Sequence, residues 1–304
     1  MNWPYTVPEE KKIRLIVNTD AMNEADDQFA IVHALLTPRF HIRGLIAAHF
    51  GERSATSMED SYDEIHNILR LMKMESAAAV YKGAPAALPN EHTPVPSAGS
   101  KLIIREALED DPQPLYVIFL GPLTDLASAY LQEPRIAERL TAVWIGGGTY
   151  PDGAEEFNLG NDVAAANAVL RSPIPLWQVP KNVYSMIRVS LAELAVRVRP
   201  HGEIGQYLFD QLIECNVARR DNPRWPKGEM WSLGDSPAVS LLLDDHMFEY
   251  DLLEAPLVGP DHRYIPQPGA RKIRVYRYVD SRFTLEDLYA KLEIFHLGSR
   301  RNPT

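Results

Sequence analysis

The amino-acid sequence predicts an α/β protein, built on an open and mostly parallel β-sheet with helices on both faces. Short apolar runs such as Leu115–Leu120 (LYVIFL) alternate along the chain with segments whose apolar residues recur at helical spacing. Continuous apolar runs are typical of strands buried on both faces within a parallel sheet. No internal repeat and no clear boundary divides the 304 residues, so we expect one domain spanning residues 1–304.

The first strand and the first helix come from the segment Ile13–Leu36. Ile13–Val17 is a short apolar run between polar neighbours, which indicates a buried strand. Apolar residues then recur three and four positions apart from Phe29 to Leu36. This spacing predicts a helix that packs back onto the strand.

The same alternation continues through the middle of the chain. Further strands are predicted at Ile42–Phe50, Leu115–Leu120, Val143–Ile145 and Leu176–Val179. Helices are predicted at Met58–Met74, Lys101–Leu108, Leu123–Leu131 and Asp162–Leu170. Gly121-Pro122 makes the turn from strand to helix, and residues 84–96, rich in Pro and Ala, indicate an irregular loop.

The last third of the chain mixes helices, loops and strand-like runs. Ser190–Asn216 has a helical pattern, Asp221–Gly234 is a loop rich in Pro and Trp, and Asp235 opens another apolar helix. Strand-like runs follow at Phe248–Val258 and Ile273–Tyr278, with a final helix near Leu285–His296.

The charge and the cysteine content of the chain exclude several classes of protein. A net charge of −10 argues against binding to nucleic-acid polymers, which requires basic surfaces. The single cysteine, Cys215, leaves no internal disulfide and is typical of a reducing compartment. The first residues contain no apolar signal-peptide core, and no apolar run approaches the ~20 residues of a membrane helix. We therefore expect a cytoplasmic protein that does not associate with membranes.

Acidic residues are concentrated where the first predicted strand gives way to its helix. Asp20, Glu24, Asp26 and Asp27 all lie in this short connection. In an open α/β sheet, the crevice beyond the carboxyl ends of the strands is where ligands bind. Several carboxylates there would repel one another, and a hard divalent cation such as Ca²⁺ or Mg²⁺ is their usual partner. The alternative is that Asp26 and Asp27 only complement the helix dipole and Asp20 is a turn residue.

Four motifs, in order along residues 13 to about 243, together resemble the nucleoside hydrolase family, of the inosine-uridine preferring kind. They are Asn18-Thr19-Asp20 followed by Asp26-Asp27; Gly121–Ala127 (GPLTDLA); Gly146–Gly148 with Glu156-Phe157-Asn158, Asp162 and Ala164–Ala166; and Gly234–Val239 (GDSPAV). Each could be purely structural, for example a tight turn at Gly121-Pro122, a solvated carboxylate at Glu156 or a helix N-cap at Asp235.

The chain also departs from the family's pattern. Asn18 stands where many members have an aspartate, and Asp125 replaces the usual asparagine. The turn Ala21–Ala25 is longer than usual and lacks the family's Pro-Gly, and Val163 takes the place of a proline. Gly234 occupies the position of a histidine that often protonates the leaving base.

The resemblance implies a nucleoside hydrolase-like fold with a Rossmann-like core, and Ca²⁺-dependent hydrolysis of the N-glycosidic bond of ribonucleosides in purine or pyrimidine salvage. The resemblance assigns the metal ligands as Asp20, Asp27, Asp235 and the carbonyl of Leu120. Asp20 would also be the general base, while Asp26, Glu156, Asn158 and Asp235 would bind the sugar, with Glu156 and Asn158 on the side of the 5′-hydroxyl. The partner is a small nucleoside or ribosyl substrate, and we expect a homo-oligomer, a dimer or a tetramer.

Two further residues are candidates for roles near the base. His49, at the end of the second strand, is the candidate acid in place of the missing histidine, because His246 lies 11 residues beyond Asp235 and too far along the intervening helix. Trp231 is a candidate for stacking on the base. For both, packing within the protein is the alternative.

Two rival functions remain open at this stage. One is a protein that binds ribose or nucleosides but has lost hydrolysis, and the other is a metal-dependent phosphohydrolase. The first acidic loop lacks the basic residues that a phosphate needs.

Overall fold

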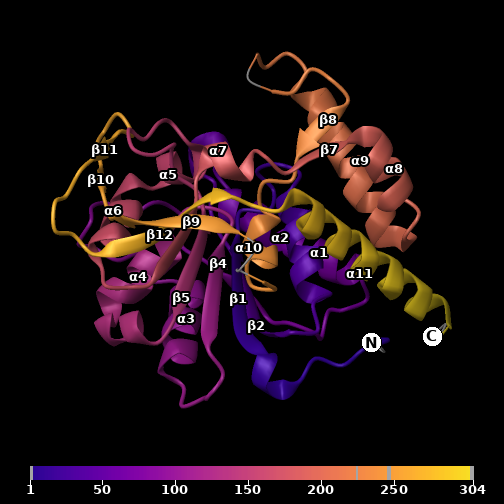
Figure 1. Cartoon of the computed structure of the whole chain (residues 1–304), viewed down its shortest axis with the longest axis horizontal. Coiled ribbons are helices and arrows are strands. Elements are labelled where there is room, and N and C mark those ends of the chain that lie inside the picture. Colours follow the sequence, from indigo (N-terminus) through magenta and orange to yellow (C-terminus); the bar gives the residue numbers. More distant parts are fainter. Residues whose placement is uncertain (1–2, 224, 245–247, 302–304) are drawn as a thin grey trace.

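A computed structural model describes residues 3–223, 225–244 and 248–301, and it confirms the α/β fold. An eight-stranded sheet runs through the molecule in the order β3-β2-β1-β4-β5-β6-β12-β9 (Figure 1). Its strands are β1 (Ile13–Thr19), β2 (Phe40–Ala47), β3 (Val80–Lys82), β4 (Leu115–Phe119), β5 (Thr141–Ile145), β6 (Leu176–Val179), β12 (Lys272–Tyr278) and β9 (Glu249–Glu254). All neighbours are parallel except β12 and β9, so β9 forms an antiparallel edge.

Helices cover both faces of this sheet. One face carries α3 (Ala98–Leu108), α4 (Thr124–Gln132) and α6 (Val163–Arg171); the other carries α1 (Asp27–Leu35), α2 (Ser57–Leu71), α10 (Pro237–Ser240) and α11 (Ser281–Arg301). Alternate residues of a central strand enter the two cores, as Leu15 and Ile16 of β1 do. Because both side-chain directions are buried, Leu15, Ile16 and Val17 form a continuous apolar run within β1, which is why the sequence predicted this strand so clearly.

A small lobe stands beside the main sheet. It contains the two-stranded sheet of β7 (Arg188–Ser190) and β8 (Met230–Ser232), together with α8 (Leu191–Arg197) and α9 (Gly202–Ala218), at the upper right of Figure 1. The sequence predicted one helical stretch over Ser190–Asn216, which is wrong in detail. The chain breaks after α8 near Pro200, and Gly202 has a φ of +76°, a conformation that glycine tolerates.

The remaining elements are short. They are α5 (Phe157–Asn161), α7 (Lys181–Tyr184), the hairpin of β10 (Leu257–Val258) and β11 (Tyr264–Ile265), and 3₁₀ turns at Glu9–Lys11, Gly51–Arg53 and Pro134–Glu138. The predicted strand Phe248–Val258 is therefore divided between β9 and β10. Among the described residues, no helix is both long and apolar enough to cross a lipid bilayer.

The strand order fixes where a ligand can enter. From β1 the chain adds β2 and β3 on one side, and then returns to place β4, β5 and β6 on the other side. The connections after β1 and β4 therefore leave in opposite directions and open a crevice at the carboxyl edge of the sheet. Asp20 directly follows β1 at this edge, and Leu120 directly follows β4.

Candidate functional site

A narrow cavity opens at the crevice between β1 and β4. Seven residues singled out from the sequence line it: Asp20, Asp26, Asp27, Leu120, Glu156, Asn158 and Asp235. Asn23, Glu24, Phe157 and Tyr184 line it as well, although none of them was a predicted site residue. The centre of a water-sized sphere can occupy about 50 Å³ of the cavity, which is room for a few water molecules or hydroxyl groups.

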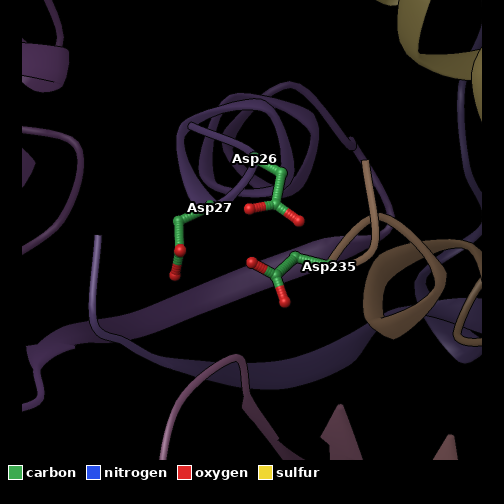
Figure 2. A group of neighbouring side chains, drawn as sticks. All are labelled: Asp26, Asp27 and Asp235. Carbon is green, nitrogen blue, oxygen red and sulfur yellow. The ribbon is translucent and has the colours of Figure 1, made fainter. Parts of the chain in front are cut away.

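Three aspartates from distant parts of the sequence meet in this cavity. Asp26 and Asp27 come from the start of α1, and Asp235 comes from the loop before α10 (Figure 2). A carboxylate oxygen from each lies within 4.8 Å of the other two, close enough to hold a metal ion. Backbone hydrogen bonds from Gly234 and Asp235 to the Asp26 carboxylate join the two segments. Asp20 lines the same cavity but lies outside this group of three.

Burial and mutual repulsion make these carboxyl groups hard to ionise. Burial, and then the charge of Asp27, raise the pKa of Asp20 well above its usual value. Burial, and then Asp26, raise the pKa of Asp27 to about 7, and burial raises the pKa of Asp26 to about 6. The pKa of Asp235 is raised well above its usual value by burial and by Asp27. The charge of Arg219 lowers the pKa of Asp26, but it does not outweigh burial, so the pKa of every carboxyl group in the cluster stays raised.

The cavity also contains a polar atom without a partner. Asp20 is 1% exposed, and no hydrogen bond reaches its Oδ2 atom. A buried carboxylate oxygen in this state is costly unless it is protonated or bound to a cation. Together with the three clustered aspartates it forms a set of hard oxygen donors, and these residues fit a divalent cation such as Ca²⁺ or Mg²⁺.

Asn158, which lines the cavity, connects the ends of two strands. Its Nδ2 atom donates hydrogen bonds to the carbonyl oxygens of Leu120 (2.7 Å) and Ile145 (2.9 Å). The carbonyl of Leu120 keeps its second lone pair, because a carbonyl oxygen can accept two hydrogen bonds. Asn158 therefore fixes the edge of β4 next to the position from which that carbonyl could bind a metal.

The Glu156 carboxylate is fully engaged in hydrogen bonds. As N-cap of α5 it accepts from the backbone N–H groups of Asn158 (3.1 Å) and Leu159 (2.9 Å), and it also accepts from the N–H of Gly147 (2.8 Å). The hydroxyl of Tyr184 donates a fourth hydrogen bond at 3.0 Å. Glu156 therefore has both roles: it caps the N-terminus of α5, and it lines the cavity.

Two departures from the family's pattern compensate each other. The Nδ2 atom of Asn18 donates to Oδ2 of Asp125 at 3.0 Å, and both side chains are buried. Asp125 also accepts from the Ser97 hydroxyl and from the backbone N–H of Ala84. Asn18 stands in place of an aspartate and Asp125 in place of an asparagine, so the hydrogen bond between them joins an amide and a carboxylate in positions exchanged relative to that pattern.

Two arginines hold the longer first turn, Ala21–Ala25, in place. Arg53 donates from Nη1 to Oδ1 of Asn23 at 2.6 Å, and Arg219 donates to the backbone carbonyl of the same residue. The Arg53 guanidinium also lies 3.8 Å from the centre of the Phe157 ring, so it connects the turn to α5. These contacts replace the rigidity that a Pro-Gly turn would supply.

His49 does not reach the cavity. It is 1% exposed, its Nε2 atom lies 2.8 Å from the Thr124 hydroxyl, and its Nδ1 atom accepts from the N–H of Gly51. Burial lowers the pKa of His49 to about 4, so the ring is neutral at physiological pH. The structure therefore gives no support to His49 as the acid, because a position after a strand end on the correct edge of the sheet does not ensure that the side chain points into the crevice.

Trp231 is also directed away from the cavity. It is 2% exposed in the core, and its ring stacks on Trp225 with the planes 7° apart and the centroids 5.4 Å apart. It is absent from the cavity lining, so the structure supports its packing role. The rejected acid candidate His246 lies outside the described residues. None of the described residues that line the cavity is a histidine.

This arrangement defines a class of protein: an α/β protein with an acidic cavity at the carboxyl edge of its sheet, whose carboxylates fit a divalent cation. The chain matches the model of the inosine-uridine preferring nucleoside hydrolase family over residues 15–285. It therefore belongs to this family, whose enzymes are metal-dependent, and it is an N-glycosyl hydrolase of ribonucleosides.

Individual relatives are distant but cover most of the chain. The chain is 24% identical to uridine nucleosidase 1 of Arabidopsis thaliana, over 72% of this chain and 77% of that protein. It is 22% identical to the pyrimidine-specific ribonucleoside hydrolase RihA of Salmonella arizonae, over 66% and 70%. Among solved structures, a purine-preferring ribonucleoside hydrolase from Gardnerella vaginalis superposes with a TM-score of 0.78 at 20% identity, over 93% and 99% of the two chains. The plant nucleoside hydrolase PpNRh1 gives a TM-score of 0.77 at 18% identity, over 92% and 99%.

Proposed function

We propose that this enzyme hydrolyses the N-glycosidic bond of ribonucleosides in a Ca²⁺-dependent reaction that releases ribose and the free base. The observation that carries this proposal is the convergence of seven predicted site residues, from separate segments, on one cavity. Membership of the nucleoside hydrolase family sets aside the phosphohydrolase alternative.

Asp27, Asp235, Asp20 and the carbonyl of Leu120 would hold the cation. The charge of Asp27 raises the pKa of Asp20, and the charges of Asp27 and Asp20 raise the pKa of Asp235, so the three carboxyl groups lie close together. When bound, a divalent cation there would acidify a water molecule and hold sugar hydroxyl groups. Ca²⁺ is our choice because it accepts six to eight oxygen ligands in flexible geometry, and this cavity offers carboxylates from a turn, a helix and a loop.

The chain's own residues divide the remaining tasks. Asp20 accepts the proton of the attacking water, since its Oδ2 atom is free of other hydrogen bonds. Asp26, held by the backbone of Gly234 and Asp235, accepts a hydrogen bond from a ribose hydroxyl. Asn158 and Glu156, which also line the cavity, would lie on the side of the 5′-hydroxyl. The bond breaks through an oxocarbenium-like state, which neighbouring carboxylates stabilise.

A panel of nucleosides tests this function directly. Ribose release from uridine, cytidine, inosine, guanosine and adenosine is measured with Ca²⁺ present, and we expect turnover of at least one. If nucleosides bind but none releases ribose, the chain is a binding protein that has lost hydrolysis. We further expect a homo-oligomer that acts in the cytoplasm in purine or pyrimidine salvage.

The metal is tested by the thermal stability of the protein at two pH values. Because the pKa of Asp27 is raised to about 7 and that of Asp26 to about 6, the folded, metal-free protein holds protons that the unfolded chain releases near pH 4. These groups therefore destabilise the metal-free fold as pH rises from about 4 to about 7. A bound cation removes this repulsion and competes with the protons.

We expect Ca²⁺ to raise the Tm of chelator-treated protein more at pH 8 than at pH 5. Differential scanning calorimetry with Ca²⁺, with Mg²⁺ and with chelator alone makes the comparison. The Mg²⁺ arm is the matched control for the choice of cation. An equal rise at both pH values, or none, would contradict the proposed site.

A further inference from the structure

The pairing of Tyr184 with Gly234 is a feature that neither the sequence motifs nor the family assignment accounts for. Tyr184 ends α7, which lies next to α5 above the sheet (Figure 1), and its side chain lines the cavity. Gly234, directly before Asp235, lines the cavity next to Tyr184.

The Tyr184 ring fills the space that a side chain on residue 234 would need. A Cβ atom added to Gly234 would lie 2.8 Å from Cδ2 of Tyr184, and 3.4 Å from Oδ2 of Asp26. Carbon atoms in van der Waals contact are about 3.5–4.0 Å apart, so the ring would have to move. Glycine at 234 is therefore what allows Tyr184 to occupy this wall.

The Tyr184 hydroxyl closes the hydrogen-bond shell of Glu156. The carboxylate has about four acceptor sites, and three of them are taken by backbone N–H groups that belong to the turn and to α5. Only the fourth donor, Tyr184, comes from a side chain. The Glu156 carboxylate therefore has no free acceptor site for a substrate hydroxyl on this side.

The phenol offers that hydroxyl a partner instead. A phenolic oxygen that donates to a carboxylate still accepts a hydrogen bond. Burial and the Glu156 charge raise the pKa of Tyr184 well above its usual value, so the phenol keeps its proton. The chain Glu156–Tyr184 thus presents an acceptor to the cavity.

We propose that Tyr184 is a substrate-contacting residue that accepts a hydrogen bond from the sugar hydroxyl on the Glu156 side, and that Gly234 is required to leave room for it. This inference rests on the proposed function and adds a specificity residue to the site. In the proposed arrangement, the hydroxyl concerned is the one at the 5′ position.

The test compares Tyr184→Phe with wild type on a ribonucleoside and on its 2′-, 3′- and 5′-deoxy analogues. We expect kcat/KM to fall about 10-fold for the parent and for analogues that keep the contacted hydroxyl, and to change little for the one analogue that lacks it. Tyr289→Phe is the matched control, because it removes a phenol–carboxylate hydrogen bond to Glu193 between α11 and α8. A change in kcat/KM that is equal, within threefold, for all analogues would mean that Tyr184 is only structural.

The contact with Gly234 is tested by a double-mutant cycle. Gly234→Ala should reduce kcat/KM in the wild-type background, because the new methyl group displaces the ring, and should add little in a Tyr184→Ala background. A full loss in both backgrounds would show that residue 234 acts through Asp235, which would overturn the pairing. If the wild-type protein releases no ribose from any nucleoside, both the proposed function and this inference are wrong. If the wild-type protein is active but Tyr184→Phe leaves kcat/KM unchanged, only this inference is wrong.

Discussion

Asp20→Asn is expected to fold normally and to lose about 10²–10⁴-fold in kcat. The amide cannot accept a proton from water, and it is a poorer ligand for a hard cation. Stability should not suffer, because Asp20 is a buried carboxyl group whose pKa is raised well above its usual value by burial and by Asp27. Its removal relieves repulsion in the metal-free protein.

Three measurements check this expectation. Steady-state kinetics gives kcat, calorimetry gives the Tm of the metal-free protein, and the Ca²⁺-induced rise in Tm should be smaller than in wild type. Asp63→Asn, on the exposed face of α2, is the matched control and should leave all three unchanged. A folded Asp20→Asn enzyme with wild-type kcat would rule out Asp20 as the general base.

Asn18→Asp is expected to lower the free energy of unfolding by about 2–4 kcal/mol. It removes the donor to Asp125 and places a second carboxyl group where the two side chains now lie 3.0 Å apart, both buried. Two such carboxyl groups cannot both ionise easily, so the pKa of the pair is raised. The loss should therefore grow as pH rises from about 4 to 7 and shrink at low pH.

The double substitution Asn18→Asp with Asp125→Asn should recover most of the lost stability, because it restores one amide and one carboxylate in exchanged positions. Urea unfolding of the two single variants and the double variant gives the coupling free energy. Asn90→Asp, in an exposed loop, is the control for the added charge. If the losses in free energy of unfolding of the two single variants simply add in the double variant, the two residues cannot exchange places.

The sequence predicted the structure best for strands that are buried on both faces of the sheet, because burial there restricts the residues to apolar ones. β1, β4 and β5 are apolar runs inside a parallel sheet, so their positions were predicted to within two residues. β3 was missed because it has three residues at the sheet edge, too few to show a period. The helix after Asp235 is only Pro237–Ser240, since apolar residues there continue into turns that pack against the core.

The same limit applies to the site. Motif order located the residues that line the cavity, because acidic residues at strand ends share one edge of a parallel sheet. It could not give side-chain directions, and so His49 and Trp231 were placed near the base although both point into packed surroundings. Tyr184 belongs to none of the motifs and is the last residue of the short helix α7. Tyr184 became a candidate only because its ring fills the space beside Gly234. The sequence alone does not show that these two residues are close in the fold.

The acidic cluster joins parts of the chain that are made at different times. Asp26 and Asp27 lie near the start of the sequence, whereas Asp235 follows about 200 residues later. During synthesis on the ribosome, the first carboxylates emerge long before the last one, and the closing contact spans most of the chain. The three carboxylates can therefore meet only after the strands β1 to β6 have been made, and a cation at the proposed site would bind only at a late stage of folding.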